Sequence, residues 1–431
     1  MNSIWQDVHM PEFPPLEGDA KTDVLVIGGG MAGLLCSHFL TKAGVDTTVV
    51  EENRICGGIT KNTTAKITFQ HGLIYHKLVK KLGMERAKMY LRAGIRALDA
   101  YRALCEEIPC GFETKNNYVY HTTDAAILEQ EVDAVHRLGF PAEYKKELPL
   151  PFPTAGAVKF RRQAQFHPLE FAAGIAKELK IYENTSVRRL KGTTATTDRG
   201  CITAKKVIVA THFPFWNRHG SYFLKLYQQR SYVLALQDGP DVGGMFVSAE
   251  DGGWSFRNYG SYLLLGGNNS RTGKKSTGWE PLKKAAKDWY PDALPAYQWA
   301  AQDCITLDGV PYIGHYSALT PDVYVATGFN KWGMSSSMTA ALILCDQIME
   351  KEDPYAAIFN PSRSILNPQL AINALESACN LLRPTVPRCP HLGCALKWNR
   401  QERSWDCPCH GSRFDEQGHK ITNPAQKDLG R

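Results

Sequence analysis

The stretch Asp23-Val-Leu-Val-Ile-Gly-Gly-Gly-Met-Ala-Gly33 decides the fold of this chain. It begins with a short apolar run, mostly β-branched, which is typical of a buried parallel strand. Its glycines then have the spacing G-x-G-x-x-G, and residues 34–42 have a helical pattern that ends at Gly44. A second strand, 47–50, ends at Glu51. This order of strand, glycine-rich turn, helix, strand and acidic residue predicts a dinucleotide-binding βαβ unit.

Each glycine of the turn has a physical role. Gly28 permits the tight turn, Gly30 lets the backbone approach a pyrophosphate, and Gly33 lets the helix pack close to the strand. The pyrophosphate lies at the helix N-terminus, beside Met31 and Ala32, because free N–H groups and the helix dipole favour an anion there. We therefore expect cofactor contacts at these five positions.

The acidic end of the second strand and the loop after it extend this site. Glu51, with Glu52 beside it, can accept hydrogen bonds from the ribose hydroxyls. The stretch that follows is rich in Gly, Thr and Lys, and in a flavin protein a loop at this place passes over the ring system. It would bring Thr63, Thr64 and Lys66 next to a flavin, whereas the alternative is an ordinary surface loop.

The rest of the chain predicts one dinucleotide site rather than two. The glycine pairs at 243–244 and 266–267 lie among strand-like segments, and no helix opens after them. A later strand ends at Ala210 and Thr211, where a nucleotide fold commonly closes near the adenosine. We expect these two residues to contact the cofactor.

Two further motifs point to the identity of the cofactor. They are Asp308-Gly-Val-Pro-Tyr-Ile-Gly314 and Ala326-Thr-Gly-Phe-Asn-Lys-Trp-Gly333, and a helix of small residues begins after the second one. The N-terminus of this helix favours the pyrimidine edge of a flavin, where negative charge develops on reduction. The cofactor contacts expected at this turn are Gly328, Lys331, Trp332, Gly333 and Met334.

Together with the G-x-G-x-x-G turn and Glu51, these motifs resemble the family of FAD-dependent D-amino-acid, glycine and sarcosine oxidases over residues 21–352. The resemblance implies FAD, a two-domain fold, and hydride transfer from a C–H bond next to nitrogen to N5 of the flavin. Some members attach FAD to a cysteine, but Cys304 lies only four residues before Asp308, which fits that role poorly. We therefore expect non-covalent FAD.

Candidate catalytic residues come from the segments expected to surround the flavin. Residues 226–268 alternate polar and apolar, which predicts an antiparallel sheet over the cofactor, whereas residues 278–300 have a helical pattern. Family members often hold a substrate carboxylate with an Arg and a Tyr from this sheet. The catalytic prediction is Lys66, Arg257 and Tyr259, with a surface role as the alternative for the arginine. Two further candidate bases or substrate anchors are His71 and Lys331.

The last 43 residues hold four of the twelve cysteines. They contain the runs Cys389-Pro-His-Leu-Gly-Cys394 and Cys407-Pro-Cys-His-Gly-Ser412. The first run contains Cys-x-His and the second Cys-x-x-His, and 15 residues separate the two motifs. This spacing matches the ligands of Rieske [2Fe–2S] clusters, in which two thiolates bind one iron and two imidazoles bind the other. The expected cluster ligands are Cys389, His391, Cys407 and His410.

Zinc is the alternative, because two cysteines and two histidines also suit tetrahedral Zn²⁺. Zinc fingers place both cysteines in one knuckle and both histidines in the other, whereas each loop here carries one of each. In the high-potential branch of the Rieske family, the two remaining cysteines, here Cys394 and Cys409, pair as a disulfide. The resemblance therefore implies a disulfide that ties the two loops together.

The expected fold class is α/β plus β, with a Rossmann-like FAD-binding domain, an antiparallel-sheet substrate domain and a small Rieske-like β subdomain. Little strand material precedes the first ligand loop, so this subdomain should pack on the flavoprotein body or on a partner subunit. The predicted boundaries are an N-terminal arm at 1–20, the FAD-binding domain at 21–85, 155–225 and 301–352, the substrate domain at 86–154 and 226–300, a linker with a helix at 353–388, and the cluster-binding subdomain at 389–431.

Composition and charge exclude several other classes of protein. Hydrophobic residues make up 43% and charged residues 22% of the chain, which is ordinary for a globular protein and excludes disorder. The net charge of +7 comes without long runs of one sign, so we expect no nucleic-acid partner. The N-terminus lacks a secretory pattern, and no apolar run reaches about 18 residues. We expect a cytoplasmic protein without a membrane span.

The two redox centres together predict an oxidoreductase with a small-molecule substrate. The leading hypothesis is an amine or amino-acid dehydrogenase or oxidase that passes electrons from FAD to the cluster and then to an external carrier. One alternative is a reductase or monooxygenase-type enzyme in which the cluster feeds electrons into FAD. Another is a non-catalytic electron-transfer adaptor or redox sensor. The substrate and the oligomeric state are left open.

Overall fold

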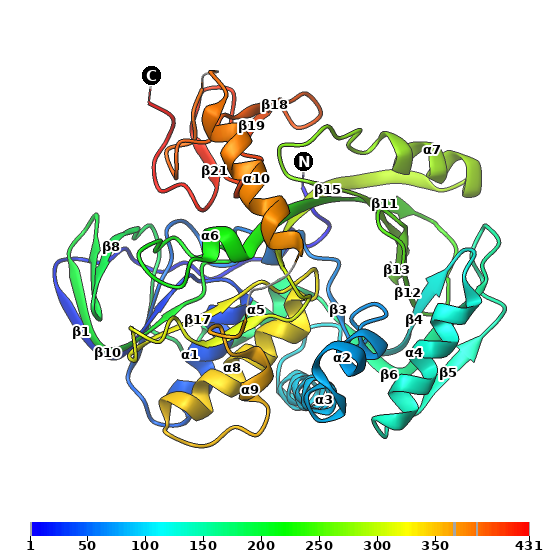
Figure 1. Ribbon diagram of the computed structural model, residues 1–431, viewed down its shortest axis with the longest axis horizontal. Helices are drawn as coiled ribbons and strands as arrows, with labels where there is room; N and C mark the ends of the chain where they lie inside the picture. Colours follow the sequence, from blue (N-terminus) through cyan, green and yellow to red (C-terminus); the bar gives the residue numbers. More distant parts are fainter. Residues whose placement is uncertain (1, 365–367, 385–386, 431) are drawn as a thin grey trace.

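Figure 1 shows the computed structural model, which describes residues 2–364, 368–384 and 387–430. Its first sheet confirms the dinucleotide-binding unit. The strands lie in the order β16-β17-β10-β1-β2-β7, parallel except for the edge strand β16, and the hairpin of β8 and β9 pairs with β10. Their bounds are β1 Ala20–Ile27, β2 Thr47–Val50, β7 Ile181–Tyr182, β8 Val187–Lys191, β9 Thr194–Thr197, β10 Cys201–Val209, β16 Tyr312–His315 and β17 Val323–Thr327.

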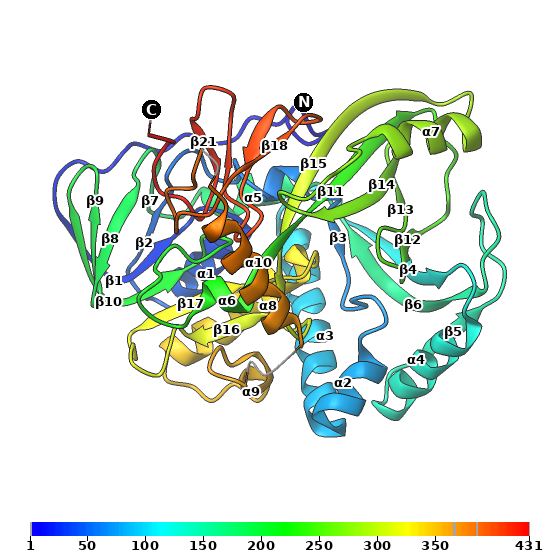
Figure 2. The ribbon, with the colours of Figure 1, turned by 45° about the horizontal axis from the view of Figure 1, so that its top comes forward.

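Three helices pack together beside this sheet. α1 (Met31–Lys42) follows β1, α8 (Gly333–Ile348) follows β17, and the two helices lie side by side (Figures 1 and 2), with α5 (Pro168–Ala176) against α1. From Met31 in α1 and from Met334 in α8, the first two turns are buried on every side, which explains the high content of small and apolar residues in these helices. Because β1 and β17 run parallel in one sheet, the N-termini of both helices lie at its carboxyl edge, where a nucleotide binds.

The second sheet is the one expected over the cofactor. Its order is β15-β11-β14-β13-β12-β4-β6-β3, with β5 paired to β6, and it is antiparallel except between β12 and β4. Its strands are β3 Lys66–Ile67, β4 Glu113–His121, β5 Ala142–Lys145, β6 Gly156–Gln165, β11 Leu226–Gln237, β12 Met245–Ser248, β13 Ser255–Tyr259, β14 Tyr262–Arg271 and β15 Leu294–Thr306.

Most of the remaining helices of the body lie around this sheet or in its connections, whereas α9 packs against β16 of the first sheet and against α3. None of the described helices has the length and apolar character that crossing a bilayer requires. Their bounds are η1 Thr60–Asn62, α2 Tyr75–Leu82, α3 Met84–Glu107, α4 Ala125–Arg137, α6 Tyr222–Lys225, α7 Glu280–Trp289 and α9 Ala356–Phe359.

The helix expected at 278–300 is wrong in its second half. α7 ends at Trp289, and Pro291 follows two residues later, where a proline disfavours helical backbone in the residue before it. Residues 294–306 instead form β15, which pairs with β11 along its whole length. Strand pairing with a distant segment therefore outweighs the local helical pattern.

The chain crosses between the two sheets more often than the predicted boundaries allow. β3 and β6 lie in the second sheet, although the ranges 21–85 and 155–225 were expected to belong to the FAD-binding domain. Conversely, α3 packs against α8, although residues 86–154 were expected in the substrate domain. The two parts consequently share one hydrophobic core, which includes residues from α1, α3, β6 and α8.

The N-terminal arm packs on the body instead of extending from it. Trp5 is completely buried, and its indole N–H donates a hydrogen bond to the main-chain oxygen of Thr63 at 2.7 Å. The arm joins the first sheet at Ala20, where β1 begins. It therefore supports the loop that was expected to pass over the flavin.

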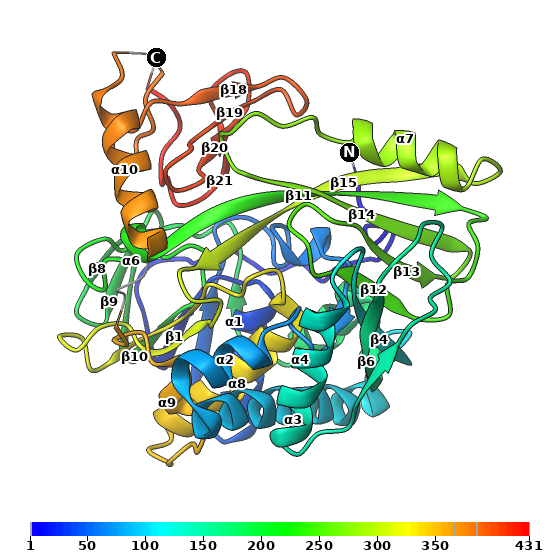
Figure 3. The same cartoon turned by 45° about the vertical axis from the view of Figure 1, so that its right-hand side comes forward.

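The C-terminal tail is a separate small unit that rests on the body (Figures 1 and 3). Helix α10 (Pro368–Leu382) precedes a four-stranded antiparallel sheet of β18 Lys397–Asn399, β19 Ser404–Asp406, β20 Arg413–Phe414 and β21 Lys420–Thr422. Arg230 of β11 forms a buried ion pair with Glu402 of the tail, and Lys420 pairs with Glu52 of the first domain. These contacts confirm that the tail packs on the flavoprotein body.

Candidate functional site

A cavity of about 990 Å³ lies where the two sheets and the tail meet. This volume lies at the upper end of the range found for ordinary ligand sites, so the cavity can hold an extended ligand. Almost every expected cofactor residue lines it, namely Gly28, Gly30, Met31, Ala32, Glu51, Glu52, Thr63, Thr64, Ala210, Thr211, Gly328, Lys331, Trp332, Gly333 and Met334. Gly33 does not line the cavity, because it faces the strand.

The glycine-rich turn has the shape that a dinucleotide requires. A Cβ on Gly33 would lie 1.9 Å from the main-chain oxygen of Gly28, so α1 can approach β1 only with glycine there. Gly28 itself has a positive φ of 110°, and a Cβ there would lie 2.7 Å from the main-chain oxygen of Ala210, the residue after β10. A Cβ on Gly30 would have no protein atom nearer than 3.6 Å, which leaves the space beside it open to a pyrophosphate.

The carboxylate of Glu51 is held in place from both sides. The main-chain N–H of Gly29 donates to it at 2.8 Å and that of Asn53 at 3.0 Å. Burial raises the pKa of Glu51, and these two donors act in the opposite direction. The residue therefore presents a fixed acceptor at the end of β2, as ribose binding requires.

Of the three catalytic candidates, only Lys66 lies in the wall of the cavity. Burial, and secondly the charge of Arg257, lower the pKa of the Lys66 ammonium to about 7. A lysine in this range exchanges its proton near neutral pH and can serve as a general base.

Arg257 lies behind the cavity wall. It is completely buried, and its guanidinium donates to the main-chain oxygens of the two residues before Lys66, at 2.7 and 2.9 Å. Its guanidinium carbon lies 5.4 Å from the ring centre of Trp5 and 5.8 Å from that of Tyr259. Neither Arg257 nor Tyr259 is among the described residues that line the cavity. Arg257 therefore fixes the loop before Lys66 through its Nη1, whereas its Nη2 has no hydrogen-bond partner among the described residues, and the carboxylate anchor stays a prediction.

The two further candidates differ in their positions. His71 lies outside the cavity lining, with Nδ1 2.6 Å from the Tyr90 hydroxyl and Nε2 2.8 Å from the Ser335 hydroxyl, and burial lowers its pKa to about 3. Lys331 lines the cavity; burial lowers its pKa, and the carboxylate of Asp303 partly offsets this. His71 is thus a core histidine, whereas Lys331 faces the cofactor space.

Sequence reasoning missed many polar residues of the cavity wall, among them His212, Gln228, Gln302 and Asp303. Two of these four lie on β15, in a segment that was partly expected to be helical. The Nε2 atom of His212 is buried without a hydrogen-bond partner among the described residues, and burial lowers the pKa of His212 to about 4. No sequence motif marks these positions, because their role depends on the contact between body and tail.

The four expected cluster ligands come together in the tail. Cys389 and Cys407 are buried in one small core, and the rings of His391 and His410 have centres 4.9 Å apart. Nδ1 of His391 and both ring nitrogens of His410 are buried without a hydrogen-bond partner in the described part of the chain. Buried imidazole nitrogens of this kind need a partner, and the iron that carries the two histidines in a Rieske cluster would supply one to each ring. The site fits a [2Fe–2S] cluster.

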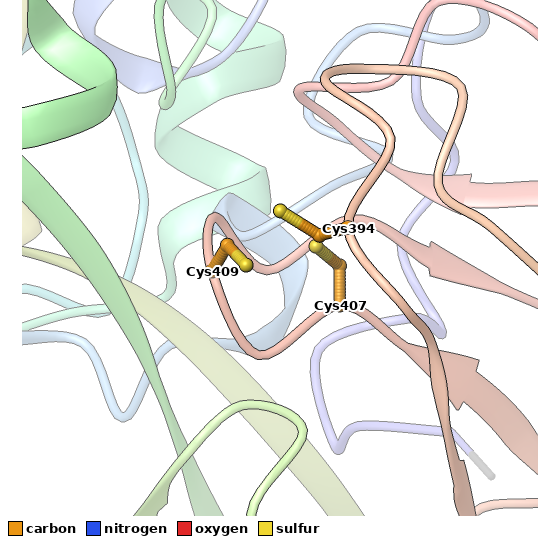
Figure 4. A group of neighbouring side chains, drawn as sticks. All are labelled: Cys394, Cys407 and Cys409. Atoms are coloured by element: carbon orange, nitrogen blue, oxygen red, sulfur yellow. The ribbon is translucent and has the colours of Figure 1, made fainter. Parts of the chain in front are cut away.

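The two remaining cysteines lie beside the same site. The Sγ atoms of Cys394, Cys407 and Cys409 lie within 4.8 Å of one another (Figure 4). All twelve cysteines of the chain are free thiols in the structure. The disulfide between Cys394 and Cys409 is therefore close to formation but not formed, and it stays a prediction.

The cluster loops contact the wall of the cavity directly. The side-chain amide of Gln228 donates to the main-chain oxygen of His410 at 2.7 Å, and that of Gln302 donates to the next residue, Gly411, at 2.8 Å. The hydroxyl of Thr422, which also lines the cavity, donates to the same oxygen of Gly411 at 3.3 Å. One layer of side chains thus separates the cavity from the second ligand loop.

The first ligand loop contacts the body as well. The side-chain amide nitrogen of Asn217 lies 2.8 Å from Nε2 of His391. The ring of Phe213, which follows the cavity residue His212, lies 6.3 Å from that of His391 and 6.1 Å from that of His410. Both expected imidazole ligands therefore point toward the flavoprotein body.

Comparison with known proteins agrees with this geometry. Residues 23–347 match the family of FAD-dependent oxidoreductases, and residues 370–430 match the Rieske [2Fe-2S] domain. The second match begins at α10, inside the segment that was expected to be a linker. The sequence is 33% identical to YhfW of Bacillus subtilis, and the alignment covers 97% of this chain and 95% of that relative. The name of YhfW describes a Rieske 2Fe-2S iron-sulfur protein.

Two further likenesses concern the body alone. The gamma-glutamylputrescine oxidoreductase of Escherichia coli is 27% identical over 46% of this chain and 50% of its own. The crystal structure of glycine oxidase from Geobacillus kaustophilus superimposes with a TM-score of 0.67 at 20% identity, over 80% of this chain and 100% of that one. The second likeness concerns the fold.

Proposed function

Because this chain belongs to the family of FAD-dependent oxidoreductases and carries a Rieske [2Fe-2S] domain, we propose that it oxidises a C–N bond of an amine or amino acid and passes the electrons through the cluster to an external carrier. FAD supplies two-electron hydride chemistry and the cluster one-electron chemistry, at potentials of roughly −150 to +300 mV for His₂Cys₂ centres.

One observation carries this proposal: the tail lines the same cavity as the dinucleotide turn. Residues 420–423 and Gln426 of the tail face the cavity together with Gly28 and Glu51. The ion pair between Lys420 and Glu52 and the hydrogen bonds from Gln228 and Gln302 hold the two parts in one arrangement. A fixed, short separation between two redox sites suits transfer inside one molecule.

The proposed role of Lys66 is to take a proton from the substrate. An amine that enters the cavity as an ammonium must lose a proton before its C–N bond can be oxidised. Lys66, whose pKa burial and Arg257 lower to about 7, can accept that proton while it is neutral. Arg257 in turn holds the loop that carries Lys66, so it acts as a positioning residue.

Opposite charges in the cavity wall support an amino acid as one class of substrate. Lys331 and Asp303 both line the cavity, and Lys331 counteracts the rise that burial causes in the pKa of Asp303. The two side chains offer a cation for a carboxylate and an anion for an ammonium group. Names of the relatives point the same way, since gamma-glutamylputrescine and glycine both carry amino groups.

An anaerobic substrate screen tests the proposal. Amines and amino acids are added to the holoprotein, while flavin absorbance and the electron paramagnetic resonance signal of the reduced cluster are recorded. We expect bleaching of the flavin followed by reduction of the cluster, at a rate that does not depend on protein concentration. A Cys407→Ser variant, which lacks one cluster ligand, should bleach without the resonance signal. A cluster that stays oxidised after the flavin has bleached would contradict electron transfer to it.

A further inference from the structure

Helix α10 has its polar side buried and its apolar side in solvent. Its two buried residues are Asn373 and Asn380. Every exposed residue from 371 to 382 is apolar, namely Ala371, Ile372, Ala374, Leu375, Ala378, Cys379, Leu381 and Leu382. The exposed fractions of Leu375 and Leu382 are 65% and 83%. A surface helix that only covered its own domain would have the opposite arrangement.

The buried side of α10 is fixed by polar contacts with the body and with the rest of the tail. The amide of Asn373 donates to the main-chain oxygen of Leu224 at 3.1 Å, and its oxygen accepts from Arg271 at 2.9 Å. The main-chain oxygen of Asn380 accepts from the N–H of Ala395 at 3.0 Å. These contacts set the rotation of the helix about its axis, so the apolar side cannot turn inward without breaking them.

The apolar side continues onto the first cluster-ligand loop. Arg388 donates to the main-chain oxygens of Leu381 and Gly393 at 3.1 and 2.8 Å, which joins the end of α10 to that loop. Leu392, next to the expected ligand His391, is 39% exposed. We call Ile372, Leu375, Leu381, Leu382 and Leu392 the α10 patch. Figure 3 shows α10 on the outer flank of the tail.

The surroundings of the α10 patch are positively charged. From Ser377 to Gln401 the sequence contains three arginines and one lysine but no Asp or Glu. Burial lowers the pKa of Lys397, and the positive charges of Lys274 and Arg383 lower it further, whereas Glu376 acts in the opposite direction. Glu376, the one acidic residue of α10, is paired with Lys274 at 2.6 Å. An apolar centre with a cationic rim is complementary to an acidic partner.

We propose that the α10 patch is the docking site of an acidic protein that carries one electron at a time. This inference rests on the proposed function, in which electrons pass through the cluster to an external carrier. The patch adjoins the ligand loop from the outside, while both histidines face the body, so a docked carrier would reach the cluster from the side opposite the cavity. A small contact area suits this use, since redox encounters bury less than about 1,200 Å² in total.

A second copy of the chain fits the same surface poorly. The commonest dimers are twofold symmetric and bring the same patch of both copies together. Such a dimer would set Arg383 and Lys397 near their own equivalents, and like charges in an interface are destabilising. The cationic rim therefore favours a partner of opposite sign.

The test measures electron exchange at the cluster without using a substrate. A reduced, acidic plant-type [2Fe–2S] ferredoxin is mixed with the oxidised holoprotein in a stopped-flow instrument, and the cluster absorbance is followed. The ferredoxin loses one electron and the cluster gains one, which is downhill because His₂Cys₂ centres have the higher potential. We expect a second-order rate that falls as ionic strength rises. An oxidised basic cytochrome c, mixed with the reduced holoprotein, should show the opposite salt dependence.

Two double variants address the surface itself. Arg383→Glu with Lys397→Glu, and separately Leu375→Ser with Leu382→Ser, should each slow reduction by ferredoxin by about tenfold or more. Matched controls lie elsewhere on the molecule: Lys283→Glu with Lys284→Glu on α7, which Figures 1 to 3 show well away from α10, and the exposed Leu319→Ser. These controls should keep the rate of the unchanged protein. All variants are compared at equal cluster content, read from the resonance signal.

Three outcomes would overturn the proposal. The first is an equal rate of reduction by ferredoxin in the patch variants and the controls. The second is a native dimer that becomes monomeric only in Leu375→Ser with Leu382→Ser, and the third is binding of the protein to anionic vesicles that the same variants abolish. Because the ferredoxin reaction bypasses flavin and substrate, a failed substrate screen would leave it unaffected. A failure of docking can therefore be distinguished from a failure of the proposed function.

Discussion

At Gly33, a single side-chain atom decides whether the dinucleotide turn can form. A methyl group there would lie 1.9 Å from the oxygen of Gly28, so the helix and strand would have to separate. We expect Gly33→Ala to cost about 3 kcal/mol at this contact and to weaken FAD binding about a hundredfold. Flavin absorbance per protein after desalting measures the loss.

Gly44→Ala is the control for this variant. Gly44 follows the other end of α1 with a positive φ of 83° and has no atom within 4 Å of a Cβ. Alanine there costs only about 1 kcal/mol of backbone strain, so the protein should keep its flavin. Equal flavin content in both variants would contradict the assigned role of Gly33.

Lys66 gives the proposed reaction a defined pH dependence. Burial and Arg257 lower its pKa to about 7, so the neutral amine that acts as a base predominates above that pH. The rate of flavin bleaching at saturating substrate should therefore rise with pH through about 7. Lys66→Met should lower this rate by about 10²- to 10⁴-fold and abolish the rise. A profile of unchanged shape in Lys66→Met would exclude this residue as the base.

Among the elements, β11 joins the body to the tail through buried charges. The carboxylate of Glu402 forms one ion pair with Arg230 of β11 and a second, at 2.9 Å, with Arg413. All three side chains are less than 9% exposed. Burial opposes ionisation of Glu402, but the two arginines hold its pKa below the usual value. At pH values above the ordinary pKa of a glutamate, the ion pairs of Glu402 therefore stabilise the docked tail in full. This stabilisation is lost as the pH falls through the lowered pKa of Glu402.

Removing Glu402 leaves the buried Arg230 without a carboxylate partner, whereas Arg413 keeps Asp406 at 2.9 Å. Glu402→Ala should destabilise the docked tail by about 3–5 kcal/mol, seen as an earlier loss of the cluster signal on heating. Glu416→Ala, which breaks an exposed pair with Arg403, should cost only about 0–1 kcal/mol. Similar melting of the two variants would show that the buried pair does not hold the tail.

The second half of the segment 278–300 shows why element type can be mispredicted. Its residues have a helical spacing, yet β11 offers a long unpaired edge on which they form β15. That edge exists only after the body has folded. Two cavity residues, Gln302 and Asp303, were missed for the same reason, since their position depends on a strand that the local pattern does not indicate.

For the whole molecule, the shared cavity predicts that body and tail depend on each other. A chain of about 60 residues buries little apolar surface by itself, and the tail directs its histidines and Glu402 toward the body. Expressed alone, residues 368–431 should fail to retain a cluster. A chain that ends after Ser364 should bind FAD more weakly, because residues 420–423 and Gln426 would be missing from the cavity. Cluster and flavin contents of the two fragments, compared with the full chain, measure both effects; an isolated tail with an intact resonance signal would contradict this dependence.

By itself, the sequence determined the two chemistries of this protein. Turn glycines, Glu51 and the four cluster ligands lie within short stretches, and their roles follow from local backbone geometry and ligand type, which spacing encodes directly. Only the tertiary structure decided how these parts meet. Arg257 donates to the loop before Lys66, β15 brings Asp303 into the cavity wall, and Gln228 and Gln302 touch the second cluster loop. Such contacts join segments far apart in the chain, and their energies come from packing and burial that no local pattern records.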